Sequence, residues 1–125
     1  MTEHDEQVKL FQWAKMYEHR YPGLQLLYAN PLGGKRPKRT ASKMKQEGAK
    51  AGVPDLTLPV PANGYHGMYI EMKYGKNKPT EAQQWWLDRL TAEGYKTVVA
   101  YGWEEAADAI CDYLGMEWPY GLPEL

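Results

Sequence analysis

Two alternating stretches on either side of an Asn-Gly pair constrain the fold of this chain more than any other feature. In residues 53–60 (VPDLTLPV) and 68–74 (MYIEMKY), apolar side chains recur at every second position. A period of two is typical of a half-buried β-strand. Asn63-Gly64 lies between the stretches, and this dipeptide is a strong signal for a two-residue hairpin turn. The sequence therefore predicts an antiparallel β-hairpin with one apolar face.

The charged residues of this hairpin share its other face. If the apolar side chains of both strands face one core, alternation places Asp55, Glu71 and Lys73 together on the opposite side, away from the turn. Two carboxylates can hold a Mg²⁺ ion, and a neighbouring lysine can orient water or stabilise charge on a phosphate. The same residues can also form an exposed salt-bridge cluster, which contributes little to stability. Alternation alone leaves both interpretations open.

The rest of the chain predicts an α/β sandwich with helices on a mixed sheet, in the order α-β-α-β-β-α-β-α. The hairpin is antiparallel, whereas a helical crossover to the next strand favours parallel pairing. A length of 125 residues suits one domain, which we place at residues 1–115, with a Pro-rich tail at 116–125. The other predicted elements are a helix from Thr2 to Pro22-Gly23, a strand at 24–29, a basic loop at 30–40, a weak helix at 41–52, a helix at 79–94, a strand at 95–102 and a helix at 103–115.

Basic and acidic residues occupy different parts of the chain. Residues 35–50 hold seven of the 15 basic residues and one acid, whereas six acids and no Lys or Arg follow from Gly102 onward. The net charge of −1 favours no partner by itself, but a local basic surface suits a polyanion. A solvated loop and helix face would show the same pattern, so charge alone does not decide for nucleic acid.

The motifs around the hairpin resemble the VRR-NUC branch of the PD-(D/E)XK nuclease superfamily. GVPD at 52–55 and EMK at 71–73 match the PD…ExK pattern, and PTEAQQWWLDRLTAEGYKTVVAYG follows them from residue 79. EHDEQ and ANPLGGKR, earlier in the chain, extend the resemblance over about residues 3–114. It implies a restriction-endonuclease-like α/β core and an endonuclease that depends on Mg²⁺ or Mn²⁺.

The resemblance also implies roles for the hairpin residues. Asp55 and Glu71 match the metal-binding acids of the family, together with the backbone carbonyl of Met72. Lys73 matches the catalytic lysine. In the implied reaction, a water activated by the metal ion attacks the phosphorus of a phosphodiester in line.

Two further residues have a structural interpretation beside a catalytic one. The resemblance matches Gln83 to a residue that supports the site. It also matches Glu3 to such a residue, in an E-x-x-x-Q pattern that ends at Gln7. Gln83 can equally close a capping box with Thr80. An acid in a first helical turn is favoured by the helix dipole in any case, and Glu6 takes the place of Glu3 if the helical phase differs.

DNA is the partner that the resemblance implies, in branched or structured form, as for Holliday-junction resolvases. A two-fold homodimer would suit paired cuts, with exposed apolar residues on 79–93 or 103–115 as its interface. The alternatives are a DNA-binding module of this fold without catalysis and a sequence-reading restriction-type nuclease. The residues expected to contact DNA phosphates are Lys35, Arg36, Lys38, Arg39, Lys43 and Lys45.

A reducing compartment is the simplest expectation for this chain. The single cysteine, Cys111, has no partner for an internal disulfide. No run of apolar residues is long enough to span a membrane. We therefore expect the cytoplasm of a bacterial cell or of a phage-infected host, with no membrane partner.

Overall fold

The computed structural model describes residues 2–30 and 38–117, and its elements follow the predicted order with one added 3₁₀ helix, η1. The α/β fold class is therefore confirmed. The elements are α1 (Glu3–Tyr17), η1 (Pro22–Leu26), β1 (Tyr28–Ala29), α2 (Lys38–Gln46), β2 (Leu56–Leu58), β3 (Met68–Lys73), α3 (Glu81–Ala92), β4 (Lys96–Tyr101) and α4 (Trp103–Leu114).

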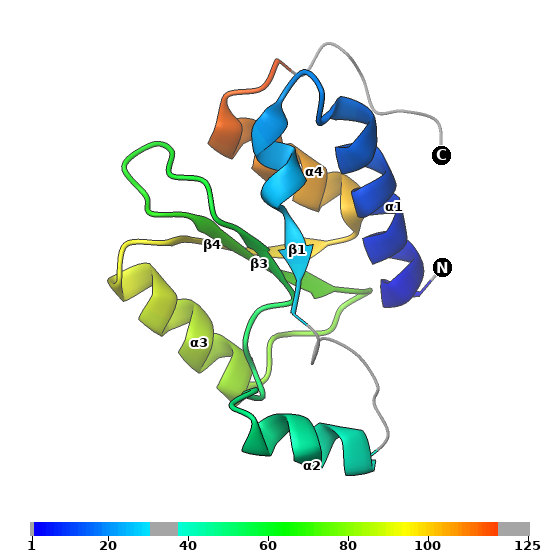
Figure 1. Cartoon of the computed structure of the whole chain (residues 1–125), viewed down its shortest axis with the longest axis vertical. Coiled ribbons are helices and arrows are strands. Elements are labelled where there is room, and N and C mark those ends of the chain that lie inside the picture. Colours follow the sequence, from blue (N-terminus) through cyan, green and yellow to red (C-terminus); the bar gives the residue numbers. More distant parts are fainter. Residues whose placement is uncertain (1, 31–37, 118–125) are drawn as a thin grey trace.

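Within the described residues, four strands form one mixed sheet in the order β1-β2-β3-β4 (Figure 1). β2 pairs antiparallel with β1 and β3, whereas β3 and β4 run parallel. Helix α3 makes the crossover that a parallel pair requires. The hairpin register pairs Leu56 with Ile70 and Leu58 with Met68, so the apolar faces of the two strands coincide as predicted.

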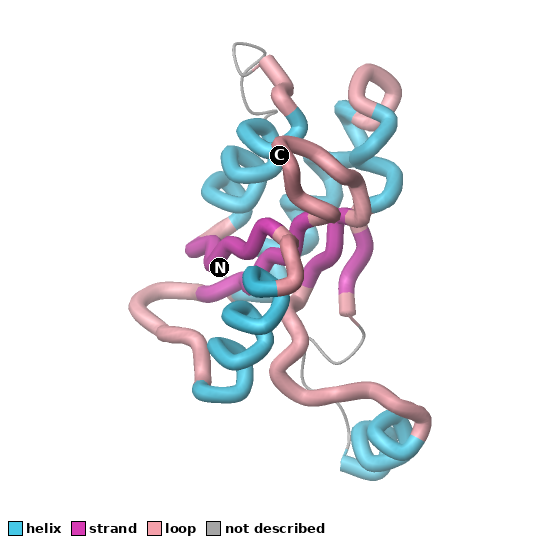
Figure 2. The backbone as a smooth tube through the Cα atoms, turned by 90° about the vertical axis from the view of Figure 1, so that its left-hand side faces the viewer, coloured by secondary structure: helices cyan, strands magenta, loops and turns pink. Residues whose placement is uncertain are grey.

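The two faces of the sheet carry different helices. α1 and α4 pack over one face, α3 lies on the other, and α2 stands apart from the sheet (Figures 1 and 2). Across residues 2–30 and 38–117, each helix is too short or too polar to span a bilayer. The core lies beneath α1 and α4, and its side chains without exposed surface include Leu10, Leu56, Leu58, Met68, Ile70, Ala100 and Ile110.

The connection between β2 and β3 contains the predicted Asn-Gly turn. Asn63 has φ +51° and Gly64 has φ +83°, and a type I′ turn requires positive φ at both positions. The backbones of Ala62 and Tyr65 exchange two hydrogen bonds across it, of 2.8 and 3.2 Å. The Asn63 side chain also donates to the carbonyl of Tyr113 at 2.8 Å, which ties the turn to α4.

The strand predicted at 24–29 is wrong over most of its length. Leu24 and Leu27, three positions apart, are buried, whereas Leu26 between them is 51% exposed. This spacing is helical, and Pro22 begins η1 because its fixed φ suits a first helical turn. Only Tyr28–Ala29 pairs with β2.

The segment predicted as a basic loop and a weak helix is shifted in the structure. Helix α2 begins at Lys38, inside the predicted loop, and ends at Gln46 rather than near residue 52. Gly48 ends it with φ +104°. The N–H groups of Gly48 and Ala49 donate to the carbonyls of Lys45 and Met44, which is the Schellman pattern of helix ends.

Gly52 fits closely against α3 just before Asp55. Its φ is +90°, and a Cβ added there would lie 2.9 Å from the backbone carbon of Ala82. Only glycine combines this conformation with this approach. The contact holds the segment between α2 and β2 against α3, just before Asp55 enters the sheet.

We expect Gly52→Ala to destabilise the protein more than Gly48→Ala. Both glycines have positive φ, but a Cβ at Gly48 meets nothing within 4 Å. Gly48→Ala therefore costs only the backbone strain, about 1 kcal/mol, and Gly52→Ala adds a steric term of about 1–3 kcal/mol. Urea unfolding of both variants measures the difference, and equal free energies of unfolding would contradict the close contact.

Candidate active site

The hairpin register carries Asp55 to a position opposite Glu71. Leu56 pairs with Ile70 and Thr57 with Tyr69, so one further step along β2 pairs position 55 with position 71. Asp55 Oδ2 accepts a hydrogen bond of 2.8 Å from the backbone N–H of Met72. The Asp55 carboxylate therefore reaches across to β3, beside Glu71.

Hydrogen bonds on both sides hold the segment that carries Asp55. The backbone N–H of Asn30 donates to the Asp55 carbonyl at 2.7 Å, and the Asn30 side chain donates to the Val53 carbonyl at 3.3 Å. On the other side, Trp86 Nε1 donates to the Ala51 carbonyl at 3.2 Å. The end of β1 and the helix α3 thus position this acid together.

Glu71 is a buried carboxylate with unmet hydrogen-bonding capacity. The residue is 2% exposed, and its Oε1 has no hydrogen-bond partner in the described structure. The pKa of Glu71 is raised to about 9, first by burial and then by a hydrogen bond to Asp55 and the Asp55 charge; Lys73 opposes this shift, and Glu3 adds to it. A buried carboxylate without a hydrogen-bond donor or a cation beside it is costly to ionise, so Glu71 favours the protonated form in this environment.

Lys73 supplies an amine next to these acids. It lies two residues beyond Glu71 on the same face of β3 and is 9% exposed. Its charge acts on Glu71 by lowering the pKa of that acid. Lys73 forms no ion pair with the described residues, so its ammonium is available for a phosphate oxygen or a water.

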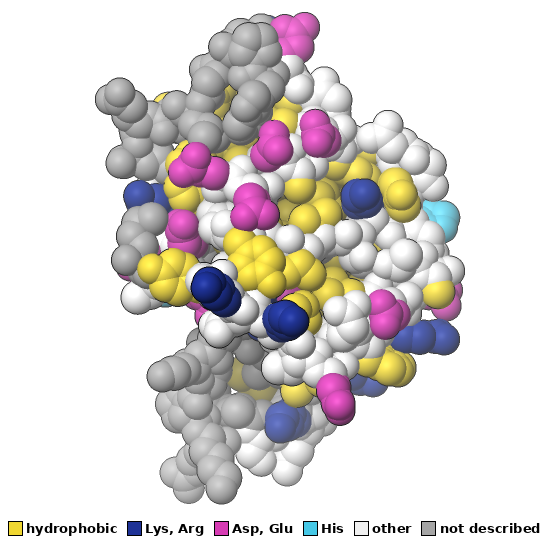
Figure 3. Space-filling model, turned by 180° about the vertical axis from the view of Figure 1, so that it is seen from behind, with side chains coloured by type: hydrophobic (Ala, Val, Ile, Leu, Met, Phe, Trp, Pro, Cys, Tyr) yellow, Lys and Arg dark blue, Asp and Glu magenta, His cyan; other side chains and the backbone are white. Residues whose placement is uncertain are grey.

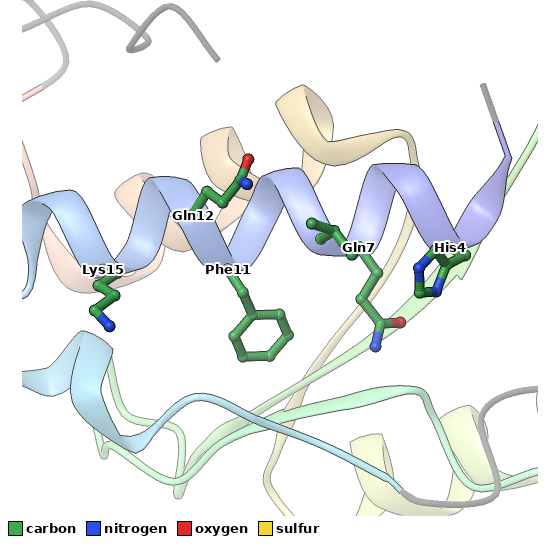
Figure 4. Close-up of a pocket in the computed structure, with 6 residues that line it drawn as sticks. His4, Gln7, Phe11, Gln12 and Lys15 are labelled. Carbon is green, nitrogen blue, oxygen red and sulfur yellow. The ribbon is translucent and has the colours of Figure 1, made fainter.

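The first turn of α1 lies near this edge of the sheet. Glu3 is exposed, and its charge reaches Glu71. Glu6 is half-buried: its Oε1 lies 3.0 Å from where a Cβ of Gly102 would be, and its Oε2 is buried without a partner in the described structure. Gln7 lies instead along a shallow hollow on α1 with His4 and Phe11 (Figure 4).

Gln83 closes a capping box at the start of α3. The backbone N–H of Thr80 donates to Gln83 Oε1 at 2.9 Å, and the backbone N–H of Gln83 donates to Thr80 Oγ1 at 3.2 Å. The structural interpretation of Gln83 is therefore observed. A supporting role in catalysis stays a prediction.

The basic residues expected to contact DNA precede Asp55 in the sequence. Lys35 and Arg36 fall outside the described residues. Lys38 and Arg39 belong to the first turn of α2 rather than to a loop, and Lys43 and Lys45 are exposed further along this helix.

Sequence reasoning missed Tyr101. In the parallel register, Tyr101 pairs with Lys73 and Val99 with Glu71, so the tyrosine shares the face of the candidate site. Its hydroxyl donates to the carbonyl of Asn77 at 2.8 Å. Alternation in the strand at 95–102 could have identified its face, but only the β3–β4 register places it beside the lysine.

We expect the protein without divalent cations to lose stability as pH rises from about 5 to 9. Folding raises the pKa of Glu71 from 4.5 to about 9, so in this window the folded state binds a proton that the unfolded state has released. The unfolding free energy therefore falls with pH. Thermal unfolding in EDTA should show this, and Glu71→Gln should reduce the dependence and raise the Tm at pH 8.

The matched control for this substitution is Glu47→Gln, because Glu47 is exposed. This variant should follow the wild-type pH profile. If Glu71→Gln also followed the wild-type pH profile, the Glu71 carboxyl would not be the titrating group.

Comparison with known proteins agrees with this fold. A family model described as the VRR-NUC domain matches residues 1–104. A solved structure of a VRR_NUC domain protein has a TM-score of 0.79 and 31% sequence identity, and the match covers 93% of this chain and 90% of that one. Among curated proteins, none matches. The chain therefore belongs to the VRR-NUC family of nuclease domains, with its restriction-endonuclease-like fold.

Proposed function

We propose that this protein is a metal-dependent endodeoxyribonuclease that hydrolyses phosphodiester bonds in branched or structured DNA. The observation that carries the proposal is the meeting of Asp55, Glu71 and Lys73 on one face of the β2–β3 pair. Two acids and a lysine in this arrangement suit the hydrolysis of a phosphate diester. Membership of a nuclease family supports DNA as the substrate.

The donor set fits a Mg²⁺ or Mn²⁺ ion. Glu71 Oε1 is buried and unpaired, and the adjacent Asp55 carboxylate offers its second oxygen. Both cations prefer carboxylate and carbonyl oxygens. In the proposed site, Asp55, Glu71 and the carbonyl of Met72 hold the ion, and its charge removes the electrostatic cost of ionising Glu71.

The chain's own residues would then act around the bound ion. The ion supplies charge that lowers the pKa of a water and neutralises the scissile phosphate. Lys73, largely buried beside the acids, orients that water or donates to a non-bridging oxygen as negative charge develops. Glu3, at the edge of the site, and Gln83, at the start of α3, support this arrangement.

The charge distribution indicates from which side DNA approaches. Several acidic side chains gather on the upper part of the face seen in Figure 3. Basic α2 lies on the α3 side of the sheet, away from α4 (Figure 1). Phosphates would be repelled from α4 and attracted to α2. The outward acids of α4 are Glu104, Glu105, Asp108 and Asp112.

We further propose a homodimer, since paired cuts at a branch point suit two-fold symmetry. Of the two helices expected to form the interface, α3 carries Trp85, which is 57% exposed. The apolar side chains of α4 face the core, and its outward acids would oppose their copies. The interface is therefore proposed on α3.

The nuclease proposal predicts that Asp55→Asn, Glu71→Gln and Lys73→Ala each reduce cleavage by at least about 100-fold. Purified protein with Mg²⁺ or Mn²⁺ is tested against single-stranded, duplex, flap and four-way DNA. Without a divalent cation, wild type should not cleave. Mg²⁺ should raise the Tm of wild type, since binding to the folded state stabilises it, and should do so less for Glu71→Gln.

Glu47→Gln and Lys15→Ala are controls of the same chemistry at exposed positions, and they should cleave normally. Circular dichroism is used to check that each variant is folded. Wild-type cleavage by any of the three site variants would remove that residue from the mechanism.

The dimer proposal predicts a mass of two chains at micromolar concentration by light scattering. Trp85→Ala should shift the protein towards monomer, because it removes the exposed indole of α3. Leu26→Ala, at a side chain that is 51% exposed, should not. A monomeric wild type would refute the dimer, and dissociation by Leu26→Ala alone would move the interface to η1.

A further inference from the structure

The turn between β3 and α3 is anchored to the end of β4. The N–H of Asn77 donates to the carbonyl of Tyr74 at 3.3 Å, which closes a turn whose second residue, Gly75, has φ +64°. The hydroxyl of Tyr101 donates to the Asn77 carbonyl at 2.8 Å. A side chain from the neighbouring strand therefore fixes the turn that directly follows Lys73.

This anchor lies next to the candidate site. Tyr101 is the register partner of Lys73 in the parallel β3–β4 pair, and paired residues point to the same face of a sheet. Tyr101 therefore lies beside the proposed catalytic lysine on the same face, while its hydroxyl holds the turn. Tyr101 remains 38% exposed, so ligands can reach this edge.

This turn and the residue directly after it carry two basic side chains that follow Lys73 closely in the sequence. Lys76 and Lys78 are exposed, and neither forms an ion pair with a described residue. Two acids, Glu104 and Glu105, lie in the first turn of α4, which follows Tyr101 in the chain. A polyanion at the site would lie towards the lysines and away from these acids.

We infer that Lys76 and Lys78 contact backbone phosphates of the DNA strand that enters the site, and that Tyr101 is the residue that positions them. The inference rests on the proposed nuclease function and names which part of the chain holds the strand. Lys76 lies inside the turn, whose ends stay within about 7 Å of each other, and Lys78 directly follows it. The bound strand then crosses the end of β3 with its scissile phosphate at the acids.

Salt dependence of binding tests the two lysines. Each lost phosphate contact reduces the slope of log K against log salt by about 0.7–0.9. In a Glu71→Gln background, binding of fluorescent single-stranded and four-way DNA is measured over a range of KCl. Lys76→Ala/Lys78→Ala should reduce the slope by about 1.4–1.8. The double control Lys15→Ala/Lys96→Ala, at the other end of α1 and at the start of β4, should leave it unchanged.

A matched pair of tyrosines tests the anchor. Tyr101→Phe removes the bond to Asn77, and Tyr113→Phe removes a similar bond of 2.6 Å to the Val60 carbonyl, near the hairpin turn. In the otherwise wild-type enzyme, Tyr101→Phe should raise KM by about two- to tenfold with little change in kcat. Tyr113→Phe should lower thermal stability but leave KM unchanged.

The possible results distinguish a failure of the roles assigned to Lys76, Lys78 and Tyr101 from a failure of the proposed nuclease function. If wild type cleaves with a divalent cation but the lysine double variant keeps the wild-type salt slope, the turn does not hold DNA. If Tyr101→Phe and Tyr113→Phe change KM equally, Tyr101 acts only through stability. If wild type cleaves no DNA with either cation, the proposed function fails, and this inference fails with it.

Discussion

The register of the β2–β3 hairpin is the constraint on which the other features of this protein depend. Leu56 opposite Ile70 buries one face of the pair beneath α1 and α4. The side-chain period of a strand is two, so a slip of one residue would turn Glu71 and Lys73 into the core. The Asn-Gly turn and the apolar face therefore maintain the position of the site as well as the stability of the sheet.

Burial of Glu71 lowers the stability of the folded chain when no cation is bound, but it suits the proposed role of Glu71 as a metal ligand. An acid with 2% exposure and an unpaired oxygen stays protonated to high pH, and ionising it lowers the stability of the folded chain. A divalent cation would reverse both effects by favouring the ionised form. Strongly shifted acids are common at functional sites, and Glu71 is the acid of the described chain whose pKa is raised most.

Residues from several elements around the sheet hold the segments that carry the candidate site. Asn30 beside β1 and Trp86 on α3 fix the segment before Asp55. Tyr101 on β4 fixes the turn after Lys73. The acids of α4 lie on the outward side of a helix whose other face forms part of the core, and in the proposed function they would repel a polyanion.

Alternation in the sequence was sufficient to determine the hairpin, its core face and the face shared by Asp55, Glu71 and Lys73, because side-chain direction along a strand follows from position alone. Local signals also determined the caps at Thr2 and Thr80 and the Asn-Gly turn. They did not reveal η1, whose leucines are buried at helical spacing, or the start of α2. Only the tertiary structure decided the burial of Glu71 and the place of Tyr101, because both depend on pairing between β3 and a strand that is reached through a crossover.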